Sequence, residues 1–139
     1  MTEILGNPLS RNWQTIQARQ PRFSEVMITD AFGRLVAATN KTSDYYQADE
    51  QWWQDCYAEG RGRVFLSDIA WDDSALNTDG IPGSLVANLC LPIYADDTRP
   101  TTRRASAAES VPPIILPGRT VVGVLKASFD ATWLVRQLT

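Results

Sequence analysis

The chain has 139 residues, 44% of them hydrophobic, and a formal net charge of −3, so it can bury one core of ordinary size. Its acidic balance excludes the basic surface that nucleic acids and anionic membranes attract, and no apolar run approaches the roughly 18 residues of a membrane-spanning helix. Histidine is absent, which removes Ser-His-Asp and Cys-His catalysis and the commonest zinc ligand. We expect no enzymatic activity, no metal, no cofactor and no nucleic-acid partner.

The first expected element is an amphipathic helix over residues 10–20. Leu9, Trp13 and Ile16 recur at helical spacing, Ser10 can cap the start, and Pro21 follows as a stop. Residues 25–30 are then apolar and β-branched, and a short turn leads to a second such run at 35–39. This pattern predicts a β-hairpin.

A second helix is expected over residues 49–59, because Asp49 can cap its start and Gly60 can adopt the left-handed conformation that ends it. Apolar runs predict three further strands, followed by a helix capped by Asp130; these strands cover residues 63–69, 84–91 and 120–129. Residues 95–119 are rich in small and polar types, which predicts a flexible insertion between the last two strands. The order indicates one α+β domain over residues 1–139, with a five-stranded antiparallel sheet and helices on its faces.

The two cysteines, Cys56 and Cys90, are too few for a disulfide framework and lack the paired spacing of a zinc site. Two buried free thiols are the favoured interpretation. A single bridge between them stays open in an oxidising compartment.

Several motifs together resemble Cache domains, which are PAS-like sensor domains. The opening hairpin Val26-Met-Ile-Thr-Asp-Ala-Phe-Gly33 is followed by Thr42-Ser-Asp-Tyr-Tyr-Gln-Ala-Asp-Glu-Gln-Trp-Trp53 and the turn Gly60-Arg-Gly62. Leu91-Pro-Ile93 and Val122-Gly-Val-Leu-Lys-Ala127 complete the series in the last two strands. The resemblance covers roughly residues 10–139, apart from the insertion.

The resemblance implies a PAS-like fold of the single Cache type, with a long N-terminal helix, a helix between strands two and three, and a short C-terminal helix. It implies the extracytoplasmic ligand-sensing domain of a bacterial transmembrane receptor, such as a two-component histidine kinase or a chemotaxis transducer. Membrane attachment would then come only from flanking segments outside this chain. A homodimer through the N-terminal helix is a further partner that we consider.

In Cache domains the ligand lies between the sheet and the segment that joins strands two and three. That segment is rich in aromatic residues here, among them Tyr46, Trp52, Trp53 and Tyr57. Trp53 and Tyr57 share one helix face, and Trp52 shares the adjacent face with Cys56. Aromatic rings can line a pocket and attract an ammonium group, although plain core packing explains the same pattern.

Amino-acid-binding relatives carry an arginine for the ligand carboxylate two residues before the aromatic, where this chain has Glu50. Their acidic residue for the ligand ammonium falls on Leu125 here, beside Lys126. Both anchors of an α-amino acid are therefore missing. We expect ordinary amino acids to bind poorly.

The remaining candidate ligand contacts are polar. Asp68, Asp72 and Asp73 surround Trp71 where the family supplies ligand contacts, although a solvated turn explains the same residues. Asn88 and Lys126 each interrupt an apolar strand, so each either contacts a ligand or satisfies a structural partner.

The expected ligand is a small molecule, such as an amine or a small carboxylate, bound outside the membrane. Two other functions fit the same element pattern. One is a cytosolic regulatory domain of the PAS or GAF type, and the other is a ligand-free dimerisation module.

Overall fold

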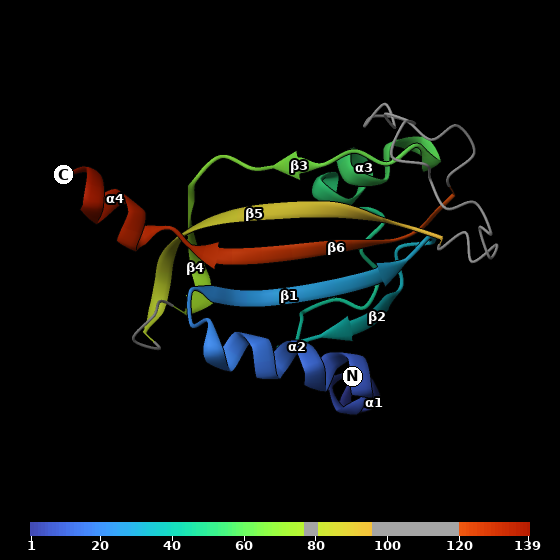
Figure 1. Ribbon diagram of the computed structural model, residues 1–139, viewed down its shortest axis with the longest axis horizontal. Helices are drawn as coiled ribbons and strands as arrows, with labels where there is room; N and C mark the ends of the chain where they lie inside the picture. The colour runs from blue at the N-terminus through green and yellow to red at the C-terminus, as the bar shows by residue number, and fades with distance from the viewer. Residues whose placement is uncertain (77–80, 96–119) are drawn as a thin grey trace, which may run out of the picture.

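The computed structural model describes residues 1–76, 81–95 and 120–139, and its elements alternate much as the sequence predicts (Figure 1). The helices are α1 (Thr2–Gly6), α2 (Pro8–Arg19), α3 (Gln51–Tyr57), the 3₁₀ turn η1 (Ala58–Gly60) and α4 (Thr132–Leu138). The strands are β1 (Phe23–Asp30), β2 (Leu35–Ala38), β3 (Phe65–Leu66), β4 (Ala70–Leu76), β5 (Pro82–Tyr94) and β6 (Val121–Asp130). No helix in these ranges is long and apolar enough to cross a membrane.

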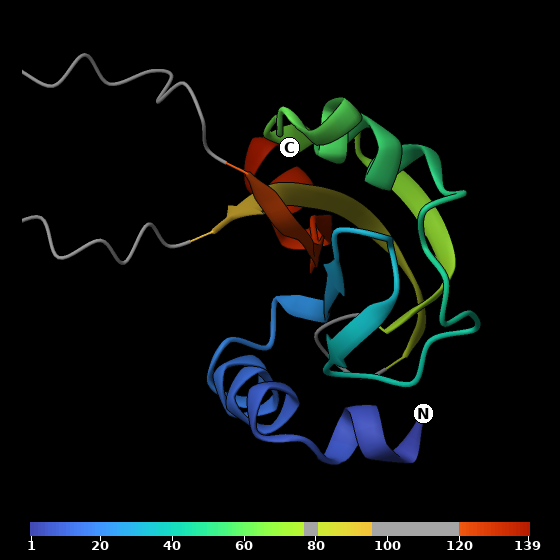
Figure 2. The ribbon, with the colours of Figure 1, turned by 90° about the vertical axis from the view of Figure 1, so that its right-hand side faces the viewer.

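One antiparallel sheet organises the domain, with the strand order β2-β1-β6-β5-β3. Strand β4 also pairs with β5, beyond the short strand β3. The sheet is curved when seen end-on, and the chain between β2 and α3 runs along one side of it (Figure 2). The expected α+β architecture is confirmed, and β4 adds a strand where the sequence suggested an acidic turn.

The predicted β-hairpin forms as β1 and β2. Its turn is fixed by the Asp30 carboxylate, which accepts the backbone N–H groups of Phe32 and Arg34 at 2.9 and 3.0 Å. Gly33 has a φ of +80° and lies against Ala48, so that a side chain at this position would collide with the Ala48 backbone. Only glycine satisfies both the left-handed backbone and this close approach.

Some predicted helix boundaries are wrong. Helix α2 is capped by Asn7, which accepts the N–H of Ser10 at 2.9 Å, and Pro8 occupies its first turn. Ser10 is instead buried, and its hydroxyl oxygen accepts the backbone N–H of Ala38 in β2 at 3.0 Å. Helix α3 begins after Glu50, which makes no side-chain capping bond, so Asp49 is not its cap.

The strand limits also differ from the prediction. Residues 63–69 contribute only the short β3, whereas β5 is longer than predicted. Asp130 ends β6, and its carboxylate accepts the N–H of Thr132 at the start of α4 at 2.8 Å. Most of the predicted insertion, residues 96–119, lies outside the described residues, and Ala95 N–H bonds Thr120 O at 2.9 Å across its two ends.

The core lies against the sheet face that α3 covers, here called the α3 face. Side chains alternate along strands, and on this face Thr29 and Met27 of β1 lie beside Val124 of β6 and Cys90 of β5. One buried cluster joins Val124 and Cys90 to two residues of α3, Trp53 and Cys56. A second cluster joins Met27 to Leu35 and Ala38 of the hairpin, with Ile4 and Leu5 of α1 packed on it.

Both cysteines are buried and free, as the sequence favoured. Burial, followed by the neighbouring Cys90 thiol, raises the pKa of Cys56 to about 12, although Arg63 lowers it somewhat. Burial likewise raises the pKa of Cys90 to about 11, against a lowering effect of Lys126. Both groups therefore stay protonated thiols at neutral pH.

Candidate functional site

A row of polar residues crosses the α3 face at the centre of the sheet. Glu25 of β1 lies opposite Ser128 of β6, and Ser128 lies opposite Asn88 of β5. Directly opposed residues on antiparallel strands share one face, so the three side chains form a continuous polar row. Because α3 packs further along β5 and β6, over Cys90 and Val124, the row lies beside the apolar core rather than within it.

Hydrogen bonds order the β5 end of this polar row. Ser128 Oγ lies 2.6 Å from Asn88 Oδ1 and donates to it. The Asn88 backbone N–H donates to Ser67 Oγ at 2.8 Å, and Ser67 N–H returns a bond to the Asn88 carbonyl at 2.9 Å. The side-chain amide of Asn88 therefore points its Nδ2 donor away from Ser128 and makes no hydrogen bond through it within the described chain.

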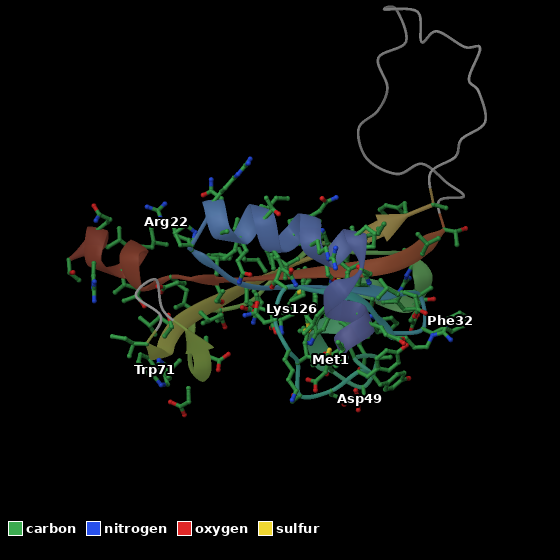
Figure 3. The ribbon with its side chains drawn as sticks, turned by 90° about the horizontal axis from the view of Figure 1, so that it is seen from below. Met1, Arg22, Phe32, Asp49, Trp71 and Lys126 are labelled. Carbon is green, nitrogen blue, oxygen red and sulfur yellow. The ribbon has the colours of Figure 1, made fainter. Side chains whose placement is uncertain are left out.

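Lys126 lies on the same face, one step along β6 toward α3. Its Cα lies opposite Met27 on one side and Cys90 on the other. Its ammonium nitrogen lies over the Trp52 ring, 5.0 Å from the ring centre, an arrangement in which the ring face attracts the cation. Within the described part of the chain it forms no ion pair with a carboxylate. Figure 3 shows Lys126 near the middle of the sheet, between Trp71 toward the α4 end and Phe32 toward the opposite end.

Glu25 is a half-buried carboxylate with an unusual environment. Burial raises its pKa above the ordinary value, the nearby charge of Lys126 lowers it by less, and Asp72 raises it further. Its side chain has neither a hydrogen bond nor an ion pair with any other described residue. A buried carboxylate without such contacts is costly, and groups of this kind are typical of binding sites.

A concavity of about 650 Å³ opens next to the polar row, where the edge of β5 passes from its partner β3 to its partner β4. Eight of the described residues line it, from β4, β5 and the β3–β4 connection: Ser67, Asp68, Ala70, Trp71, Asp72, Asp73, Val86 and Asn88. Asn88 belongs to both features, so the polar row and the concavity are continuous. Three of the lining side chains are carboxylates, and none is basic.

The acidic stretch of the concavity is part of strand β4, not a solvated turn. Trp71 lies opposite Leu85 and Asp72 opposite Ser84, so the strand is paired with β5 at this point. The Trp71 indole N–H donates to Asp73 Oδ1 at 2.6 Å. Its ring covers Gly83, where an added Cβ would lie 2.6 Å from the ring. The ring is nevertheless 62% exposed, which leaves a broad aromatic surface at the rim.

The aromatic residues of the segment before β3 divide into different environments. Trp53 is 5% exposed, donates its indole N–H to Thr29 Oγ1 at 2.8 Å and stacks on Tyr57 at 4.6 Å between ring centres. This is the environment of a core residue. The Trp52 ring contacts the Lys126 ammonium group. Tyr46 is exposed, and its backbone forms an isolated β-bridge with Arg34 at the edge of the hairpin.

Four of the predicted site residues line the concavity: Asp68, Trp71, Asp73 and Asn88. Lys126 and its neighbour Trp52 lie further along the same face, toward α3. Trp53, Tyr57 and Tyr46 do not line the concavity. Sequence reasoning missed Glu25, Ser67 and Ser128. Glu25 did carry a signal, because it is an acidic residue directly before the apolar run of residues 26–28 in the same strand.

Among the described residues, no group of three or more cysteine, aspartate or glutamate side chains is placed to hold a metal ion. Neither serine of the site has a base within hydrogen-bonding distance in the described chain, since Ser128 Oγ contacts an amide oxygen and Ser67 Oγ a backbone N–H.

Comparison with known proteins identifies the fold. No protein-family model and no curated protein matches the sequence. The extracellular domain of vpHK1S-Z8, described as a histidine kinase, superposes with a TM-score of 0.53 at 13% identity, over 94% of this chain and 42% of that one. The sensor domain of the V. cholerae histidine kinase DctB gives 0.49 at 12% identity, over 91% and 38%. This chain spans less than half the length of either structure.

At such low identity the likeness concerns the fold. The expected PAS-like fold, found in extracellular sensor domains of histidine kinases, is confirmed by the vpHK1S-Z8 structure.

Proposed function

We propose that this chain is the extracytoplasmic ligand-sensing domain of a bacterial transmembrane receptor, and that it binds a small molecule at the polar row and the adjoining concavity. Its fold is that of an extracellular sensor domain. The site offers carboxylate and amide groups that can orient a small molecule, and aromatic surface at the rim of an open volume.

The observation that carries this proposal is the connection between the site and both terminal helices. Glu25 stands near the start of β1, which follows α2 after a short link. Ser128 stands near the end of β6, which leads directly into α4. Asp130 fixes that junction, because its carboxylate accepts bonds from Ser84 Oγ and Thr132 N–H, both at 2.8 Å.

A ligand that bridges β1, β6 and β5 would act on the strands that carry these helices. If two arrangements of the helices differ in their affinity for the ligand, binding shifts their populations and so the receptor output. The receptor would be a two-component histidine kinase or a chemotaxis transducer, with flanking segments that cross the membrane. No catalytic step is required.

The same proposal includes a homodimer through the N-terminal helix. Leu9 and Ile16 of α2 lie seven residues apart, which places them on one helix face, and they are 43% and 42% exposed. Exposed apolar residues at this spacing suit helix pairing. Sedimentation equilibrium of this chain and of Ile16→Glu would detect it, with a shift toward monomer expected in the variant.

A thermal-shift screen over amines, amino acids and short carboxylic acids tests the binding proposal. A ligand at 100 times its dissociation constant adds about 2.7 kcal/mol of stability, which raises the unfolding midpoint by several degrees. The variant Asn88→Leu should lose the shift, because it removes the amide at the junction of the polar row and the concavity.

Asn12→Leu is the matched control, since Asn12 is exposed on α2 and distant from the site. It should keep the shift. A screen in which no compound of any class stabilises the protein would contradict the binding proposal, as would a hit that survives Asn88→Leu unchanged.

A further inference from the structure

We propose that the ligand carries an organic ammonium group, which the Glu25 carboxylate binds in the polar row at the margin of the acidic concavity. This inference rests on the proposed function. The proposal names the ligand class and a specificity residue. Three observations support it. Glu25 lies in the polar row without a hydrogen bond from any described residue, the lining of the concavity is acidic, and the Nδ2 donor of Asn88 is unused within the described chain.

The first step concerns what Glu25 lacks. It faces the centre of the sheet in the polar row, opposite Ser128, and is half-buried there. The hydroxyl of Ser128 is directed to Asn88 instead. No described residue gives the Glu25 carboxylate a hydrogen bond or an ion pair, so it is open to a donor from outside the chain.

The second step concerns Lys126, a cation close enough to act on Glu25. Lys126 lies within electrostatic reach of Glu25, yet its ammonium group is placed over the Trp52 ring. Because the Lys126 ammonium group contacts the Trp52 ring, it forms no direct ion pair with Glu25. The negative charge of Glu25 is therefore only partly neutralised. A second cation delivered by a ligand would complete the charge balance at Glu25.

The third step concerns Asp72. It lines the concavity together with Asn88, the residue through which the polar row joins the open volume. Asp68 and Asp73 line the same volume, and none of its lining residues in the described part of the chain is basic. A carboxylate ligand would meet repulsion from these acids, whereas an ammonium ion is attracted by all of them.

The fourth step separates an organic cation from a metal ion. A metal ion needs several converging oxygen ligands, and the described residues contain no such group. An organic cation needs one or two carboxylates for its ammonium group and some apolar or aromatic surface for its carbon chain. Val86, Ala70 and the exposed ring of Trp71 supply that surface, and the free Nδ2 donor of Asn88 suits a hydroxyl or carbonyl oxygen of the ligand.

The test uses two probes of equal chain length and opposite charge, 1,4-diaminobutane and succinate, with binding measured by calorimetry and by thermal shift on this chain. The diamine should bind and succinate should not. In Glu25→Gln the dissociation constant of the diamine should rise about tenfold or more, because a hydrogen bond to a charged group is replaced by one to a neutral amide.

Two further variants make the result specific. Glu3→Gln removes an exposed acid on α1 and should leave diamine binding unchanged. Glu25→Asp keeps the charge but shortens the side chain, and should bind the diamine more tightly than Glu25→Gln does. All variants are compared only where their thermal unfolding remains cooperative, and Glu25→Gln should fold well because it removes a buried charge.

The outcomes distinguish this inference from the proposed function. Absence of diamine binding, or diamine binding that Glu25→Gln leaves unchanged, overturns the inference. Binding of succinate without the diamine also overturns it, while it leaves small-molecule sensing at this site intact. Failure of every compound class in the wider screen overturns both.

Discussion

The hydrogen bond between Trp53 and Thr29 determines whether Trp53 belongs to the core or to the ligand site, and a conservative substitution tests it. Thr29 is 1% exposed, and its Oγ1 lies 2.8 Å from the Trp53 indole nitrogen. Thr29→Val keeps the shape of the side chain and removes the acceptor. The indole N–H is then left without a partner in the core, which costs about 1–3 kcal/mol.

The second bond of the Thr29 hydroxyl adds little to this cost. It donates to the carbonyl of Asp30 at 3.0 Å, and that carbonyl also accepts the N–H of Gly33 at 3.1 Å. The carbonyl therefore keeps a partner in the variant. We expect Thr29→Val to lower the free energy of unfolding by about 2 kcal/mol, measured by urea denaturation with an unchanged m-value.

A double-mutant cycle assigns that loss to the bond itself. In the Trp53→Phe background the N–H is already gone, so Thr29→Val should cost about 1 kcal/mol less than it does in the wild type. Thr15→Val, on the exposed side of α2, should change stability by no more than about 0.5 kcal/mol. Additive effects of the two core substitutions, or a Thr29→Val variant as stable as the wild type, would refute the core assignment of Trp53.

Three further predictions concern Glu25, the hairpin turn and the cysteines. Because the folded-state pKa of Glu25 is raised, its ionisation destabilises the protein as pH rises above about 4.5; Glu25→Gln should raise the unfolding midpoint at about pH 7 and not below about pH 4, and an equal gain at both would contradict this. Gly33→Ala should lower stability by more than about 1 kcal/mol in urea denaturation, since the φ of +80° and the contact with Ala48 both exclude a side chain; a neutral effect would show that the turn is misplaced. Cys56 and Cys90, with pKa values of about 12 and 11, should react with iodoacetamide at about pH 8 only in denaturant, and rapid labelling of the native protein would argue against their burial.

The sequence predicted those parts of the fold that depend on local chemistry. The hairpin was predictable because Asp30 and Gly33 have the residue types that its turn requires. The strand β4 was not, because adjacent aspartates are disfavoured in strands and only the pairing of Asp72 with Ser84 of β5 accounts for it. Long-range pairing of this kind leaves no local pattern.

The candidate site was predictable to a similar degree. Helical spacing showed that Trp53 and Tyr57 share a face, but it could not show which residues of the helix the sheet buries. The structure buries Trp53 and Cys56, one from each of the two faces considered. Glu25 was overlooked because its importance depends on its neighbours Ser128 and Lys126, which lie more than a hundred positions away in the chain.

The central claim, that a small cationic molecule binds at the polar row of the α3 face, is tested most directly by NMR. Backbone amide shifts of the ¹⁵N-labelled chain would be followed during titration with 1,4-diaminobutane. The account predicts saturable shifts centred on Glu25, Asn88 and Ser128, with the exposed side of α2 unaffected. Shifts that do not saturate, or that lie outside β1, β5, β6 and the concavity, would contradict it.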